Sequence, residues 1–171
     1  FLNFTGMQKP VDISIVIPLL NEEQSLSPLN DWIFKVLNNQ TLSFELIYID
    51  DGSTDQSWKS IVDLSKKYSN IKGIRFAKNF GKSQALHAGF ESANGKYVIT
   101  LDADLQDSPE EIPQLIKNLN EGGYDLISGW KKKRFDSILF KNLPSKLFNW
   151  AARRVSGINL NDFNCGIKVY R

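Results

Sequence analysis

Cysteine and histidine are nearly missing from this 171-residue sequence, which contains one residue of each. The single cysteine, Cys165, excludes an internal disulfide and a zinc site built from cysteines, and it fits a reducing compartment. The single histidine, His87, has no serine or cysteine arranged with it in the pattern of a nucleophilic triad. His87 lies among small and apolar residues, so we expect a packed or rim side chain there and not a catalytic base.

Long apolar runs are also missing. No stretch approaches 18 consecutive apolar residues and no signal-peptide pattern is present, so the sequence predicts no membrane-spanning helix. A net charge of +2 gives no reason to expect a nucleic acid partner. We expect residues 1–10 to be an N-terminal extension or an expression remnant. We expect residues 11–171 to be one catalytic domain that continues past Arg171 in the natural protein.

Apolar β-branched runs alternate with helical patterns along the chain. The runs predict strands at 13–17, 44–49, 71–76, 96–101 and 124–129. Helical periodicity predicts helices at 22–39, 55–69, 82–93 and 109–121, the last with Ser108 as its N-cap. This alternation predicts an α/β fold, a three-layer sandwich with a mostly parallel central sheet.

Polar clusters follow three of the predicted strands directly. They read PLLNEE at 18–23, DDGSTD at 50–55 and DADLQD at 102–107. Because ligands bind at the carboxyl ends of the strands in such sheets, we expect the three clusters to share one site.

The third cluster places two carboxylates two residues apart. In an extended chain Asp102 and Asp104 would point the same way, and their repulsion would call for a cation. Oxygen ligands of this kind suit Mg²⁺ or Mn²⁺, and Gln106 adds a neutral oxygen. Asp107 is expected to belong to the following turn. The alternative is that the loop acids are simply solvated.

The first two clusters permit a structural as well as a functional interpretation. DDGSTD fits a strand-to-helix turn with capping residues, or an aspartate that faces a ligand. In PLLNEE, Pro18 would end the strand. Glu22 and Glu23 would lie in the first turn of a helix, where the helix dipole stabilises negative charge.

Lysines stand beside a glycine at a fourth turn, within RFAKNFGKSQALHAGF at 75–90. The turn lacks the spacing of a P-loop, but Lys82 can reach a phosphate or a carboxylate of a neighbouring loop. The first strand is not followed by G-x-G-x-x-G, which argues against a dinucleotide-dependent oxidoreductase.

Together, PLLNE, DDGSTD, NFGK, LDADLQDSPE and DFNCGIKVYR, in this order, resemble a family 2 glycosyltransferase. The chain is most similar to the branch of dolichyl-phosphate mannose synthases and bacterial polyprenyl-phosphate glycosyltransferases. The resemblance extends from about Val11 to Arg171, and it implies the A-type nucleotide-diphospho-sugar transferase fold.

The resemblance also implies roles for individual residues. It places the nucleoside at Pro18, Leu20, Glu22, Ile49 and Asp51. Leu20 stands where eukaryotic mannose synthases often carry an aromatic residue, which leaves the base open. The resemblance places the diphosphate and sugar at Asp102, Ala103 and Asp104, and the metal at Asp102, Asp104 and Gln106.

Further phosphate contacts are expected from basic residues. The family's G-S-R is replaced here by Gly129-Trp130-Lys131, so the phosphate-binding residue is open among 131–134, with Lys132 and Arg134 among the candidates beside Lys82. The catalytic candidates are Asp104 and Asp162, the latter expected near the acceptor.

A basic segment with aromatic residues follows the last predicted strand. Residues 131–154 hold eight Lys or Arg and one acid, Asp136. Residues 137–155 have the composition of an amphipathic helix at a membrane surface. A helix packed on the sheet with a solvated basic face is the alternative.

These features lead to one expected activity with alternatives. We expect a metal-dependent inverting glycosyltransferase (hexosyltransferase) that moves a sugar from a UDP- or GDP-sugar to a polyprenyl (dolichyl or undecaprenyl) phosphate at the cytoplasmic face of the membrane. The alternatives are transfer to a saccharide hydroxyl in cell-surface polysaccharide synthesis and a non-catalytic nucleotide-binding module. A homo-oligomer is compatible with the sequence.

Overall fold

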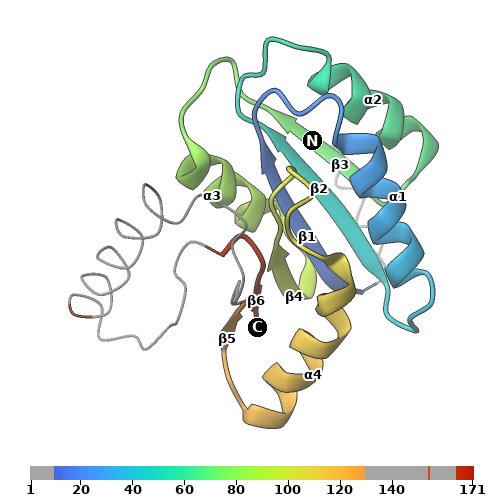
Figure 1. The fold of residues 1–171 in the computed structure, drawn as a ribbon, viewed down its shortest axis with the longest axis vertical. Helices are drawn as coiled ribbons and strands as arrows, with labels where there is room; N and C mark the ends of the chain where they lie inside the picture. Colours follow the sequence, from blue (N-terminus) through green and yellow to red (C-terminus); the bar gives the residue numbers. More distant parts are fainter. Residues whose placement is uncertain (1–9, 130–153, 155–164) are drawn as a thin grey trace, which may run out of the picture.

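Six strands form one sheet in the order β3-β2-β1-β4-β6-β5 in the computed structural model (Figure 1). The structure describes residues 10–129, 154 and 165–171. Strands β1 to β4 are mutually parallel, which confirms the predicted mostly parallel α/β sheet. The strands are β1 Val11–Leu19, β2 Phe44–Asp50, β3 Ile71–Arg75, β4 Gly95–Thr100, β5 Leu126–Ser128 and β6 Lys168–Tyr170.

Strand β6 is the element that sequence reasoning missed. It lies between β4 and β5 and runs antiparallel to both. Three residues are too few to show a strand's alternation, so periodicity gave no signal here. This strand brings the segment before it to the end of β4, where the Thr100 hydroxyl donates a hydrogen bond of 2.7 Å to the Gly166 carbonyl.

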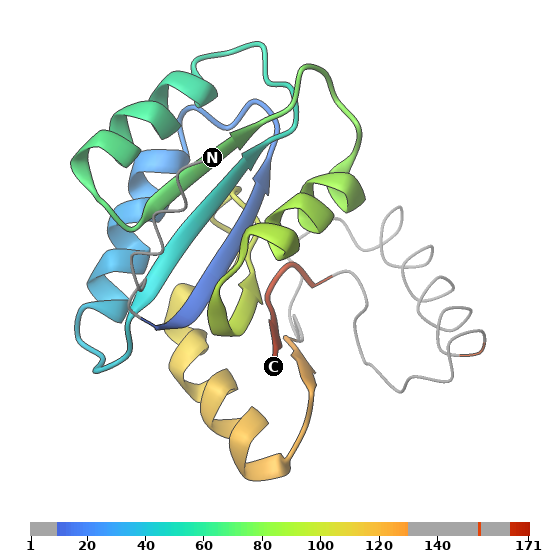
Figure 2. The ribbon, with the colours of Figure 1, turned by 180° about the vertical axis from the view of Figure 1, so that it is seen from behind.

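Helices cover both faces of the sheet. The larger core contains buried side chains of α1, α2 and α4 packed on the odd-numbered residues of β1. The smaller core packs Ala85 of α3 on the opposite face, against Val16, Ile47 and Ile49 (Figures 1 and 2). The helices are α1 Leu26–Leu37, α2 Ser57–Lys67, α3 Lys82–Ser92, the short 3₁₀ helix η1 Pro109–Glu111 and α4 Ile112–Gly122. Among the described helices, none has the length and apolar content that crossing a membrane requires.

Two predicted helix starts are corrected by the structure. Helix α1 begins at Leu26 and not at residue 22: Asn21 takes a left-handed conformation with φ of 57°, and residues 23–25 form a turn before the helix. Glu22 and Glu23 therefore precede the helix, and its first turn holds no acid. At α4, the first turn is the 3₁₀ helix η1, and the side chain of Ser108 makes no capping hydrogen bond.

Pro18 does not end the first strand, as the sequence suggested. Strand β1 continues to Leu19 and is paired with β2 from Ile13 to that residue. Backbone groups of a strand point alternately to its two neighbours, and the Val16 carbonyl faces β4 while the Leu19 carbonyl faces β2. The N–H that Pro18 lacks would therefore point toward β4, where the pairing has already ended at Val16.

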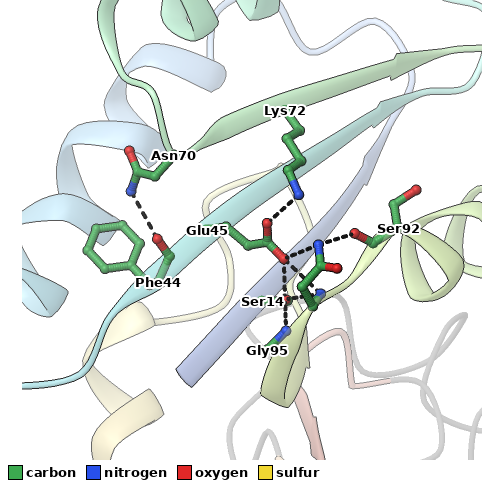
Figure 3. Close-up of polar contacts among 8 residues, drawn as sticks. Ser14, Phe44, Glu45, Asn70, Lys72, Ser92 and Gly95 are labelled. Carbon is green, nitrogen blue, oxygen red and sulfur yellow. Dashed lines mark hydrogen bonds and ion pairs between the residues drawn. The ribbon is translucent and has the colours of Figure 1, made fainter. Parts of the chain in front are cut away.

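A buried carboxylate connects three strands at the amino end of the sheet (Figure 3). Glu45 is 4% exposed, and its carboxylate lies 2.6 Å from the Lys72 ammonium. It accepts hydrogen bonds from the Ser14 hydroxyl at 2.7 Å and the Asn94 backbone N–H at 2.9 Å. Burial alone would raise the pKa of Glu45, but the bonds from Lys72, Ser14 and Asn94 outweigh it and lower this pKa.

Candidate functional site

The loops after β1 and β2 are joined by hydrogen bonds in both directions at the carboxyl end of the sheet (Figure 1). The N–H groups of Asn21 and Glu22 each donate at 2.8 Å to the hydroxyls of Ser53 and Ser57. In return, the Thr54 N–H donates to the Asn21 side-chain oxygen at 2.9 Å. The expected meeting of PLLNEE with DDGSTD therefore occurs, and the two loops stabilise each other.

The two aspartates of DDGSTD have different partners. Asp50 is buried in its own turn, where Oδ1 accepts the Ser53 N–H at 2.7 Å. Asp51 reaches the loop between β3 and α3, and its carboxylate accepts the N–H groups of Phe80 at 2.7 Å and Gly81 at 2.9 Å. Asp51 therefore positions the loop that leads into α3.

Gly52 allows this loop to approach closely. Its φ is +80°, and a Cβ at this position would lie 2.5 Å from the Lys78 carbonyl carbon and 2.7 Å from the Asn79 nitrogen. Only glycine tolerates both this φ and this contact without strain.

Lys82, the first residue of α3, pairs with the DADLQD loop. Its ammonium lies 2.5 Å from Asp102 Oδ1, and both side chains are partly exposed. The sequence left a phosphate and a carboxylate open as partners of Lys82, and the carboxylate is the partner in this structure.

The DADLQD loop turns sharply after Asp104. Leu105 has a φ of 63°, a conformation that leucine rarely adopts, and the Gln106 N–H donates to Asp104 Oδ1 at 3.1 Å. Asp107 is buried, so it is not the solvated loop acid of the alternative interpretation. The segment before β6 packs on this loop, since a Cβ on Gly166 would come within 2.5 Å of carboxylate oxygens of Asp102 and Asp107.

These loops enclose a cavity of about 320 Å³. It is lined by residues of the three polar clusters, of α3 and of the turn that precedes α3. They are Pro18, Leu19, Leu20, Glu22, Asp51, Asn79, Gly81, Lys82, Ala85, Asp102, Ala103 and Asp104.

Other predicted residues lie elsewhere. Ile49 is fully buried in the α3-side core, and Gln106 is exposed on the loop outside the cavity lining. His87 is not packed: its side chain is 68% exposed on α3, 3.6 Å from Glu91. Cys165 is buried. Lys131, Lys132, Lys133, Arg134, Asp162 and the segment 137–153 fall outside the described residues.

Asp102 and Asp104 fit a divalent cation that takes its remaining ligands from a phosphate and water. Asp102 and Asp104 both line the cavity, and Asp104 is exposed with no ion-pair partner among the described residues. Nowhere in 10–129, 154 or 165–171 do three or more His, Cys, Asp or Glu converge as a closed metal site. Mg²⁺ commonly combines one or two carboxylates with water and substrate phosphates.

Sequence reasoning missed two groups of site residues. Asn79 and Gly81 line the cavity although their motif carried no recognised spacing. Gly166, in the segment before the unpredicted strand β6, lies against Asp102 and Asp107 of the DADLQD loop. Gly81 and the glycine in DFNCG were the only signals in the sequence, and glycine alone does not identify a partner.

Comparison with characterised proteins gives close sequence relatives. The dodecaprenyl-phosphate galacturonate synthase of Rhizobium johnstonii is 34% identical over 97% of this chain and 50% of its own length. The undecaprenyl-phosphate 4-deoxy-4-formamido-L-arabinose transferase of Shewanella sediminis is 41% identical over 93% of this chain and 48% of its own length. The chain thus spans about half the length of the curated relatives it matches.

Solved structures share the fold at lower identity. Glucosyl-3-phosphoglycerate synthase of Mycobacterium tuberculosis, solved with Mn²⁺, UDP and phosphoglyceric acid, has a TM-score of 0.71 at 22% identity, over 94% of this chain and 55% of its own. This similarity confirms the A-type fold. The sequence profile of glycosyl transferase family 2 matches residues 14–171, nearly the whole chain. The chain belongs to glycosyl transferase family 2.

Proposed function

We propose that this chain contains the donor site of an inverting glycosyltransferase that moves a sugar from a UDP- or GDP-sugar to a polyprenyl phosphate. The observation that carries the proposal is the cavity, in which PLLNEE, DDGSTD, NFGK and DADLQD meet, and in which Lys82 lies beside two carboxylates of the DADLQD loop, Asp102 and Asp104. The names of the Rhizobium and Shewanella relatives support a polyprenyl-phosphate acceptor.

The nucleoside occupies the side of the cavity lined by Pro18, Leu20, Glu22 and Asp51 in this proposal. The hydrogen bonds between the two loops fix the backbone at Asn21 and Glu22, so that part of the cavity is formed before a ligand arrives. A preformed cavity reduces the entropy lost on binding. Leu20 is 40% exposed and offers an apolar surface to a base.

The diphosphate lies between Lys82 and the DADLQD loop. Lys82 begins α3, so the positive end of this helix points to the same place as the lysine's charge. Asp102 and Asp104 would hold Mg²⁺ or Mn²⁺, which would neutralise the diphosphate as it leaves, and Gln106, exposed on the same loop outside the cavity lining, is the third candidate ligand. Lys82 adds a charge-assisted hydrogen bond to the leaving group.

The acceptor needs little activation if it is a phosphate. A phosphate monoester is already an anion near pH 7, so it can attack the anomeric carbon without a strong base, and direct displacement inverts that centre. A hydroxyl acceptor would need a general base, for which Asp162 is the sequence's candidate. A lipid acceptor is met at the bilayer, and residues 137–155 have the composition to dock there, on the cytoplasmic face.

The test uses the full-length natural protein with Mg²⁺ or Mn²⁺, undecaprenyl phosphate and a panel of UDP- and GDP-sugars. We expect acceptor-dependent release of UDP or GDP with at least one donor, and a glycosylated lipid phosphate as the product. Release that requires a saccharide in place of the lipid would contradict the acceptor. Nucleotide binding without any transfer would indicate a non-catalytic module.

A further inference from the structure

The ion pair between Lys82 and Asp102 spans the donor cavity. The two residues belong to different elements, α3 and the loop after β4, and their charged atoms lie 2.5 Å apart. The Lys82 side chain is 54% exposed and that of Asp102 is 27% exposed. An ion pair as exposed as this one contributes little to stability. Within the cavity, this ion pair matters for binding instead, because it determines which carboxylates keep an unneutralised negative charge.

Asp102 is held on two sides. Oδ1 contacts the Lys82 ammonium, while Oδ2 lies so close to Gly166 that a Cβ there would come within 2.5 Å of it. Asp104 is two residues away, exposed, and has no cation beside it in the described part of the chain. Without a ligand, the protein's own lysine therefore neutralises one carboxylate of the pair.

The backbone that leads into Lys82 is held by hydrogen bonds, whereas its long side chain can change rotamer. The N–H groups of Phe80 and Gly81 donate to Asp51, which fixes the backbone just before α3. The four-carbon side chain beyond it has several rotamers. A diphosphate in the cavity offers more negative charge than one carboxylate, so it competes with Asp102 for the ammonium.

A divalent cation and the Lys82 ammonium compete for Asp102 as well. Two positive charges a few ångströms apart repel each other, so the metal binds weakly while Lys82 occupies Asp102. When a diphosphate takes Lys82, the carboxylate is released to the metal.

We propose that Lys82 couples the binding of the metal to the binding of the nucleotide. Before the donor binds, its ammonium compensates the charge of Asp102. When the donor binds, the ammonium moves to the diphosphate and leaves Asp102 to the metal, so that metal and nucleotide bind cooperatively. This proposal rests on the proposed function, since it needs a diphosphate in the cavity. It assigns Lys82 a role before any chemistry, namely to keep the metal affinity low until the donor arrives.

The test measures Mn²⁺ binding to the nucleotide-free 171-residue chain, from the electron paramagnetic resonance signal of free Mn²⁺. Lys82→Met should bind Mn²⁺ about three- to tenfold more tightly than the wild type, a coupling of the size usual between two ligands. Lys78→Met is the matched control, because it removes the same charge four residues earlier, from the loop that leads into α3. The Lys78 ammonium lies 5.2 Å from the Phe80 ring centroid and has no ion pair among the described residues.

Two further variants make the test specific. Lys82→Arg keeps the charge, so its Mn²⁺ affinity should match the wild type and show that the site is folded. In an Asp102→Asn background, Lys82→Met should no longer raise Mn²⁺ affinity, because the carboxylate in competition has gone.

Equal Mn²⁺ affinity in Lys82→Met and Lys78→Met would overturn the coupling. The proposed function would survive that result if the wild type still binds UDP or GDP in the presence of Mn²⁺. A wild type that binds neither nucleotide would overturn both.

Discussion

Carboxylates lie at both ends of the same sheet, and their surroundings differ. At the amino end, Glu45 is 4% exposed and has a lysine, a serine hydroxyl and a backbone N–H as partners (Figure 3). At the carboxyl end, Asp102 forms an ion pair with the half-exposed Lys82, and Asp104 is exposed. The Glu45 carboxylate has all its partners within the protein, whereas the carboxylates of Asp102 and Asp104 can still bind a ligand.

This difference separates stability from binding. A buried acid whose bonds are satisfied by three elements holds those elements together, and removing it leaves donors without acceptors. Acids that line a cavity repel each other until a cation or a cationic side chain compensates them. We therefore expect substitution of Glu45 to change the unfolding free energy, and substitutions of Asp102 and Asp104 to change ligand affinity.

The largest stability effect is expected from Glu45→Ala. It leaves the Ser14 hydroxyl without its acceptor and the Lys72 ammonium without its carboxylate, while the Asn94 N–H keeps only the Ser14 oxygen at 3.1 Å. The unfolding free energy should therefore fall by about 2–3 kcal/mol. Urea denaturation monitored by circular dichroism measures it. The control is Glu121→Ala, which removes an exposed partner 3.8 Å from Lys117 and should cost less than about 0.5 kcal/mol. Equal losses in the two variants would remove the distinction between the two ends.

Gly52→Ala should affect both stability and binding. The positive φ alone costs an alanine about 1 kcal/mol, and the contact with the Lys78–Asn79 backbone adds to this and displaces the loop before Lys82. Gly123→Ala is the control, because Gly123 also has a positive φ (63°) but nothing within 4 Å of an added Cβ. Denaturation of both variants should show a larger loss for Gly52→Ala, and only that variant should bind nucleotide more weakly.

Acid should destabilise the amino end. The folded-state pKa of Glu45 is lowered below its ordinary value of 4.5, so its contribution to stability is present above pH 4.5 and is lost as the pH falls through the folded-state pKa. Unfolding free energies measured between pH 6 and pH 3 should fall in this window. The decrease should be smaller in Glu45→Gln, and an identical decrease would show that Glu45 is not responsible.

Asp102→Asn should have the smallest stability effect. It weakens a partly exposed ion pair but also removes one of the crowded acids, so the unfolding free energy should change by less than about 1 kcal/mol. Thermal denaturation measures this. A loss as large as that of Glu45→Ala would mean that Asp102 is structural.

The sheet and the meeting of the three acidic clusters were predictable because periodicity and the strand-end rule depend on local patterns. The runs at 44–49 and 71–76 lie within one residue of β2 and β3. What could not be predicted depends on contacts distant in the sequence. The Glu45 network joins residues 31 and 49 positions apart, and nothing in FELIYI indicates that its glutamate points to Ser14 and Asn94.

Within the site, sequence reasoning identified residues but not their partners. Asp51 was expected at a nucleoside, and it also holds the NFGK loop through two backbone N–H groups. The pairing of Lys82 with Asp102 was one of two open options. Both outcomes depend on how far apart three loops lie, which follows from the packing of α3 on β1 and β2.

The most direct test of the donor site is the affinity for UDP and GDP with Mn²⁺, measured by isothermal titration calorimetry on three proteins: wild type, Asp104→Ala and Glu45→Ala. The wild type should bind one of the two nucleotides with a 1:1 ratio. Asp104→Ala should lose at least about tenfold in affinity, because the metal loses a carboxylate, while folded Glu45→Ala should keep the wild-type value. Wild-type affinity in Asp104→Ala would contradict the account.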